Sequence, residues 1–281
     1  MKIANVDGRA HLALDSRLID VEKASGGRLP ADPMALIASL DAIGDLPVPD
    51  DAPPLEGTRL DPPIPRPSKI LAVALNYRAH AEESGLELPD EPIVFPKLPS
   101  ALAGPTDDLV IPAGRTRVDW EAELVICLGR RGRRISQADA WSYVAGVTCG
   151  QDISDRKEQF RSLRQFTMAK SFDTYAPIGP MIVTLDELAD PDNLAISCSV
   201  DGEVVQSSRT SDLIFRVPEL IAWISRVCTL EPGDLIFTGT PSGVGQGRTP
   251  PRFLAPGVIL ETTIEAIGTM RNACVAGPRY P

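Results

Sequence analysis

The sequence contains few of the side chains that bind soft metals. Only two histidines, His11 and His80, occur among its 281 residues, so a catalytic zinc site with three histidine ligands is excluded. The five cysteines are odd in number, widely spaced and mostly embedded in apolar runs such as LVICLG, which favours buried free thiols over disulfides or a zinc ribbon. Any metal ion here must therefore be held mainly by oxygen.

Long hydrophobic runs and an excess of positive charge are also missing. No segment approaches the ~20 apolar residues of a membrane span, and the opening residues, MKIANVDGRAHLALDS, lack the layout of a secretory signal. With 28 basic and 38 acidic side chains, the net charge of -10 argues against nucleic acid or an anionic membrane as the main partner. We expect a cytoplasmic protein, and we expect the basic segment 129–136, GRRGRRIS, to be a solvated loop.

Closely spaced prolines divide the chain. Residues 48–69, VPDDAPPLEGTRLDPPIPRPSK, cannot form a regular helix or central strand, because proline fixes φ and lacks the N–H donor. We interpret this stretch as a linker from a small N-terminal domain, residues 1–57, onto a main domain, residues 58–281. Apolar residues at helical spacing predict a helix over 30–43.

The main domain is rich in β-branched runs between glycine and proline turns. Runs such as KILAVAL, AELVICLG, VAGVTCG and VILETTIEAIG predict strands, and helical patches interrupt them at residues 76–85 and 211–228. This is not the regular strand–helix alternation of a doubly wound sheet. The expected fold class is therefore α+β with a β-rich body.

The segment 118–129, VDWEAELVICLG, places two carboxylates on one side of a predicted strand. At a period of two residues, Glu121 and Glu123 share a face with Val125 and Cys127. One interpretation is a strand end that emerges into solvent, because charged side chains are mostly exposed. The other is a carboxylate pair in a cleft, where repulsion and desolvation require a cation.

A third carboxylate, Asp152, follows the next apolar strand, at a position where aspartate is often only a turn former. With Glu121 and Glu123 it would complete a set of hard oxygen ligands suited to Mg²⁺ or Mn²⁺. Such an ion is octahedral, so three protein oxygens leave positions open for water or substrate. An open coordination sphere indicates catalysis.

Several segments, taken in order, resemble the fumarylacetoacetate hydrolase family: the E-x-E pair, QDISDRKEQF, MAKSFDTYAPIGP and LEPGDLIFTGTPSGVG. The resemblance runs from about residue 69 to residue 272. It implies a β-rich mixed-sheet roll or sandwich with a small N-terminal domain, Mg²⁺ or Mn²⁺ bound by Glu121, Glu123 and Asp152, and a homodimer.

The resemblance also implies catalytic roles for His80, Glu83 and Lys170. His80 and Glu83 match a family pair on a short helix that closes over the metal, and their i,i+3 spacing puts both on one helical face. Taken alone, His80 would be read as a surface residue. Lys170, in AKSFDTY, matches the family's lysine beside the metal, where its charge would stabilise an enolate. The alternative for Lys170 is a solvated lysine at a strand edge.

Substrate-binding residues follow from the same resemblance. Arg156 and Gln159 have donors suited to a carboxylate or keto oxygen, Thr240 lies in the glycine-rich TGTPSGVG, and Ser100 lies in FPKLPSAL. The segment FRSLRQF adds further arginines near the site, and it leaves the distal portion of the substrate undefined.

The expected reaction is hydrolysis of a C–C bond in an acylpyruvate-like or related diketo acid through a metal-bound enolate. His80 would be the general base on water, oriented by Glu83, while Lys170 and the ion hold the negative charge. A decarboxylase or isomerase acting on a 2-oxo diacid needs the same enolate and stays an alternative, with 2-hydroxyhepta-2,4-diene-1,7-dioate isomerase and oxaloacetate decarboxylase as examples. A non-catalytic, metal-dependent keto-acid binding module is a further alternative.

Overall fold

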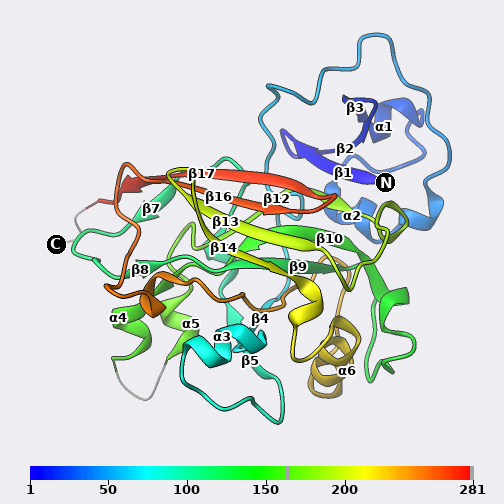
Figure 1. Ribbon diagram of the computed structural model, residues 1–281. Coiled ribbons are helices and arrows are strands. Elements are labelled where there is room, and N and C mark those ends of the chain that lie inside the picture. The colour runs from blue at the N-terminus through cyan, green and yellow to red at the C-terminus, as the bar shows by residue number, and fades with distance from the viewer. Residues whose placement is uncertain (162–164, 279–281) are drawn as a thin grey trace.

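Two packed β-sheets dominate the protein, and its helices are few and short (Figure 1). The computed structural model describes residues 1–161 and 165–278. The helices are α1 (Val21–Ala24), α2 (Pro33–Ile37), α3 (Arg78–Glu83), α4 (Arg156–Gln159), α5 (Phe166–Ala169) and α6 (Val217–Val227). The strands are β1 (Lys2–Val6), β2 (Arg9–Leu14), β3 (Arg17–Asp20), β4 (Ile70–Ala74), β5 (Ile93–Lys97), β6 (Leu102–Ala103), β7 (Leu109–Ile111), β8 (Val118–Asp119), β9 (Ala122–Leu128), β10 (Val144–Gln151), β11 (Ser154–Asp155), β12 (Ala176–Val183), β13 (Ala195–Val200), β14 (Glu203–Arg209), β15 (Leu235–Phe237), β16 (Ile259–Ile264) and β17 (Gly268–Ala276).

The larger sheet has ten strands, in the order β3-β2-β1-β12-β10-β9-β15-β4-β5, with β6 pairing with β12 off this path. A second sheet, in the order β14-β13-β16-β17-β7, packs against β9, β10 and β12 of the first. Strands β8 and β11 form a separate pair. The expected α+β class with a mixed-sheet sandwich is confirmed. None of the described helices has the length and apolar character needed to cross a membrane.

Strand β9 lies at the centre of the structure. Every residue of β9 is buried, because it sits in the middle of the larger sheet and the second sheet packs on it. Strand β10, its antiparallel neighbour, is buried along almost its whole length. The predicted site therefore starts from a fully buried part of the fold.

The N-terminal region extends the larger sheet. Strand β1 pairs antiparallel with β12, with Ile3 opposite Ile182. Residues 43–69 contain no helix and only isolated bridges, as the prolines predicted, and this stretch is tied to the N-terminal strands by bonds such as Leu18 N–H to the Pro53 carbonyl, 2.8 Å. The domain boundary at residue 57 stays a prediction.

The predicted helices are present but shorter than expected. Helix α6 begins at Val217, although the apolar pattern extended back to residue 211, because a proline belongs in the first helical turn and disfavours helix before it. The helix predicted over 30–43 ends at Ile37 and continues only as a 3₁₀ turn at Leu40–Ala42.

All five cysteines are free, and the arginines of the 129–136 loop are exposed, both as predicted.

Candidate functional site

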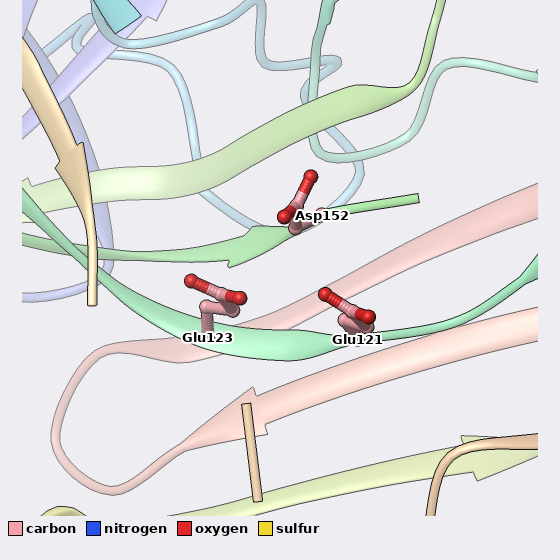
Figure 2. Close-up of side chains that lie close together, drawn as sticks. All are labelled: Glu121, Glu123 and Asp152. Atoms are coloured by element: carbon pink, nitrogen blue, oxygen red, sulfur yellow. The ribbon is translucent and has the colours of Figure 1, made fainter. Parts of the chain in front are cut away.

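The register between β9 and β10 brings the three predicted carboxylates together. Glu123 lies opposite Gly150, and the Asp152 N–H donates to the Glu121 carbonyl at 2.9 Å just beyond the ladder. One ligand oxygen from each of Glu121, Glu123 and Asp152 lies within 4.8 Å of the others. Figure 2 shows both glutamates on the same side of their strand, with Asp152 above them from the neighbouring strand.

Gly150 permits this close packing. A Cβ at Gly150 would lie 2.3 Å from Val125 Cγ2 and 2.7 Å from the Phe237 ring. Any side chain would therefore push β10 away from its neighbours or displace the core beneath the carboxylates. The glycine immediately before Gln151 and Asp152 is required by the geometry of the site.

Burial decides between the two interpretations of the E-x-E segment. Glu121, Glu123 and Asp152 are 6%, 1% and 1% exposed. The interpretation of a hydrated strand end is therefore wrong. Carboxylates are almost never this buried unless they are paired or coordinate a metal.

Two buried lysines neutralise part of the acidic cluster. Lys170 Nζ donates to Glu121 Oε2 and to Asp152 Oδ2, both at 2.7 Å, and Lys97 Nζ donates to Asp152 Oδ1 at 2.6 Å. Lys170 is only 2% exposed, so the alternative of a solvated strand-edge lysine is wrong. Burial alone would lower the pKa of Lys170, but Asp152 and Glu121 outweigh it and raise that pKa.

Glu123 is the member of the cluster that lacks a cation. Its Oε2 accepts the Gly239 N–H at 2.7 Å, and no ion pair to it occurs among the described residues. Burial, Asp152 and Glu121 raise the pKa of Glu123 well above its usual value. By contrast, Lys170 and Arg156 outweigh burial at Glu121 and hold its pKa at about 2. An all-oxygen cluster with an uncompensated buried carboxylate fits a hard divalent cation such as Mg²⁺ or Mn²⁺.

Arg156 links the acidic cluster to the opposite wall of the site. Its Nε donates to Asp119 Oδ2 at 2.8 Å, its Nη2 lies 2.7 Å from Glu121 Oε1, and its Nη1 donates to Gln159 Oε1 at 2.9 Å. Asp119 also accepts the N–H groups of Gly245 and Gln246, at 2.7 and 3.0 Å. Buried hydrogen bonds therefore fix the side-chain conformations of Arg156 and Gln159.

His80 and Glu83 form a hydrogen-bonded pair on α3. His80 Nδ1 lies 3.0 Å from Glu83 Oε2, and Glu83 Oε1 accepts the Gly243 N–H at 2.9 Å. Burial opposes ionisation of Glu83, but His80 and the Gly243 N–H outweigh it and lower its pKa. The buried Asn76 anchors the start of this segment by donating to the carbonyls of Thr238 and Phe215.

A cavity of about 530 Å³ joins these groups. The predicted residues that line it are His80, Glu83, Glu121, Glu123, Arg156, Gln159, Lys170 and Thr240. Ser100 lies on an exposed 3₁₀ turn and is not part of this lining, so its predicted contact with substrate gains no support from the geometry. Of the arginines in FRSLRQF, Arg161 is exposed and pairs with Glu158, while Arg164 lies outside the described residues.

Two further buried residues of the site, Lys97 and Asp119, were not predicted from the sequence. Lys97 is 1% exposed at the end of β5, and its sequence signal is a lysine just after the apolar run PIVF, in the same segment FPKLPSAL that contains Ser100. Asp119 lies two residues before Glu121, and the same alternation that paired the glutamates could have indicated it. Its contacts with Arg156 and residues 245–246 join segments distant in sequence, so only the folded chain reveals them.

We expect Lys97→Met to destabilise the metal-free protein. Burial lowers the pKa of Lys97 more than Asp152 raises it, but removing the lysine still strips Asp152 of a buried partner. Breaking a buried pair costs about 3–5 kcal/mol, measurable by urea unfolding. Lys69→Met, at a partly exposed lysine paired with Asp234, is the comparison. An unchanged free energy of unfolding for Lys97→Met would contradict the assigned pairing.

A buried carboxylate triad at the meeting of two central strands, with a histidine–glutamate pair across a cavity, defines a metal-dependent class of site. Residues 69–275 match the family described as Fumarylacetoacetate (FAA) hydrolase, C-terminal. This chain therefore belongs to the fumarylacetoacetate hydrolase family, as its motifs predicted.

Three relatives illustrate the range of the family. The mitochondrial oxaloacetate tautomerase Fahd2a of Rattus norvegicus is 45% identical over 213 residues, which cover 76% of this chain and 68% of the relative. A crystal structure of a protein provisionally called HpcE from Mycobacterium smegmatis is 46% identical, with a TM-score of 0.92 and coverage of 99% and 100%. Maleylpyruvate hydrolase from Sphingobium sp. SYK-6, in complex with manganese(II) and pyruvate, is 32% identical, with a TM-score of 0.81 and coverage of 99% and 100%.

Proposed function

We propose that this protein is a Mg²⁺- or Mn²⁺-dependent enzyme that interconverts the keto and enol forms of a 2-oxo dicarboxylic acid such as oxaloacetate. The observation that carries the proposal is one cavity lined by a histidine–glutamate pair, a buried lysine and the two glutamates of the carboxylate triad. The 45% identity to an oxaloacetate tautomerase supports this reaction ahead of the C–C hydrolysis expected from sequence.

The metal would be held by Glu121, Glu123 and Asp152. When bound there, the ion supplies positive charge that makes the C–H next to a keto group more acidic. This fits the cluster, because Glu123 forms no ion pair with a cationic side chain among the described residues.

His80 carries the proton in this proposal. Glu83 accepts the Nδ1–H, which leaves Nε2 free to remove a proton from the carbon next to the keto group. The electron pair of that C–H bond forms the C=C bond, and the keto oxygen takes the negative charge beside the Lys170 ammonium. The imidazolium then returns the proton to this oxygen, which completes the enol.

C–C bond hydrolysis of an acylpyruvate is the second candidate. It is supported by the 32% identity to maleylpyruvate hydrolase, whose structure contains manganese and pyruvate. In this reaction His80 would take a proton from water instead of from carbon, and the hydroxide would attack the distal carbonyl. The C–C bond to the pyruvate fragment would then break, its electron pair would form the enolate of pyruvate, and the His80 imidazolium would return the proton to that fragment. Both candidate reactions use the same cavity. They differ in whether His80 removes a proton from carbon or from water.

A substrate panel tests the proposal. The purified protein with Mg²⁺ or Mn²⁺ is mixed with oxaloacetate, and the enol absorbance and pyruvate production are followed together, alongside cleavage of acylpyruvates. Enol–keto exchange above the metal-only rate without pyruvate formation is the expected result. Pyruvate release from oxaloacetate would indicate decarboxylation, and cleavage confined to acylpyruvates would establish the second candidate.

We also propose that the protein is a homodimer. In the described part of the chain, β5 pairs only with β4 and ends the large sheet, and this free strand edge gives a physical motive for association. Five exposed apolar side chains on segments beside the cavity give another: Leu86, Leu88, Ile93, Phe160 and Met168. Light scattering at micromolar concentration should give twice the chain mass of 30.2 kDa. A monomer mass would refute the proposal.

A further inference from the structure

The loop from Gly243 to Thr249 forms the wall of the cavity that faces α3. Residues 244 and 246–249 line the cavity together with His80 and Glu83. The loop is held at both sides, because the Gly243 N–H binds Glu83 Oε1 and the Gln246 N–H binds Asp119. Side chains on this loop therefore have a defined position relative to the catalytic pair and to Arg156.

Arg248 is the cation on this loop whose donors are not used by a carboxylate. Its Nη2 donates to the Val205 carbonyl at 3.1 Å, and its Nη1 lies 3.8 Å from Glu203 Oε1, beyond hydrogen-bond reach. Glu203 is instead 2.6 Å from Arg252. The Arg248 Nε is buried and finds no acceptor in the described part of the chain.

Gln246 shows the same lack of partners beside Arg248. Its side-chain Oε1 is buried with no hydrogen-bond partner among residues 1–161 and 165–278. Buried polar atoms of folded proteins are nearly always satisfied. Gln246 Oε1 is an acceptor, so it suits a hydrogen-bond donor, whereas an anionic group needs the donors of Arg248.

The charges of the cavity specify an anionic ligand group. The basic side chains of the lining, besides His80, are Arg156, Lys170 and Arg248. Arg156 and Lys170 are each within 2.8 Å of carboxylate oxygens of the protein, so their charges are already matched. Arg248 Nη1 is left without a carboxylate in hydrogen-bond reach, and a guanidinium N–H is well suited to bind a carboxylate.

We propose that Arg248 binds the distal carboxylate of a 2-oxo dicarboxylic acid and so selects diacids over monoacids. The proposal rests on the proposed function for the identity of the reacting end, which lies at the acidic cluster. Arg248 then fixes the far end, and the carbon between the two ends is presented to His80. This assigns the part of the substrate that the sequence left undefined.

Arg248→Gln tests this assignment through two substrates. For oxaloacetate, KM should rise about 10- to 100-fold, because a charge-assisted hydrogen-bonded pair is lost, while kcat stays near wild type. For 2-oxobutyrate, a monoacid, deuterium exchange at the carbon next to the keto group is followed by NMR and should change less than about twofold. Arg271→Gln, which removes an exposed arginine on β17, should leave both substrates unaffected. Arg248→Lys should recover part of the oxaloacetate affinity.

Ligand binding separates this inference from the proposed reaction. With Mg²⁺ present, oxaloacetate and pyruvate are titrated into wild type and Arg248→Gln by calorimetry. A selective loss of oxaloacetate affinity supports the assignment even if oxaloacetate is not turned over, in which case only the proposed reaction fails. Equal losses for both ligands, or an equal fall in kcat for both substrates, would overturn it and make Arg248 a positioning residue for Glu83.

Discussion

Replacement of Glu123 by glutamine should abolish stimulation by divalent cations without destabilising the metal-free protein. Burial and the charges of Asp152 and Glu121 raise the pKa of Glu123 well above its usual value, so at neutral pH the folded protein holds this carboxylate at a cost. A neutral amide removes that cost and keeps an acceptor for the Gly239 N–H. The melting temperature without metal should therefore stay constant or rise.

Stabilisation by added metal should be lost in this variant. In wild type, Mg²⁺ at 100 times its Kd should stabilise the fold by about 2.7 kcal/mol through mass action, whereas Glu123→Gln should show almost none of this shift. Activity should fall by at least about 100-fold, since even residues that only support a metal ligand cost 10- to 100-fold. Glu87→Gln, at an exposed glutamate, is the matched control. Full activity in EDTA-treated wild type would contradict the metal site itself.

Replacement of His80 by alanine should lower kcat by roughly 10²- to 10⁴-fold, the contribution of a general base. Metal affinity should be nearly unchanged, because His80 contacts Glu83 rather than the carboxylate triad. Glu83→Gln should give a smaller loss in kcat, since the imidazole remains while its orientation and charge support weaken. Thermal shifts with Mg²⁺ and single-turnover kinetics measure the two effects separately.

Glu82 offers a control within the same helix. It is exposed and lies one residue before Glu83, so Glu82→Gln changes the charge of α3 equally and should leave kcat unaffected. A His80→Ala variant with wild-type kcat and no metal response would show that His80 is a ligand or structural residue. The general-base role would then be wrong.

The sequence by itself determined the ingredients of the site. The alternation of VDWEAELVICLG put Glu121 and Glu123 on one face, and the i,i+3 spacing paired His80 with Glu83. These relations depend only on the periods of a strand and a helix, which local backbone geometry fixes. The prolines of residues 48–69 excluded regular structure for the same local reason.

Tertiary structure alone decided which of these side chains contact one another and which are buried. The β9–β10 register put Asp152 beside the glutamates, and the second sheet buried the cluster, which turned a plausible solvent-exposed strand end into a cation site. Lys97 entered the cluster while its neighbour Ser100 stayed exposed, because burial changes within three residues when a strand leaves the core. Such contacts join segments tens of residues apart, and their energies come from desolvation and charge pairing, which no local period encodes.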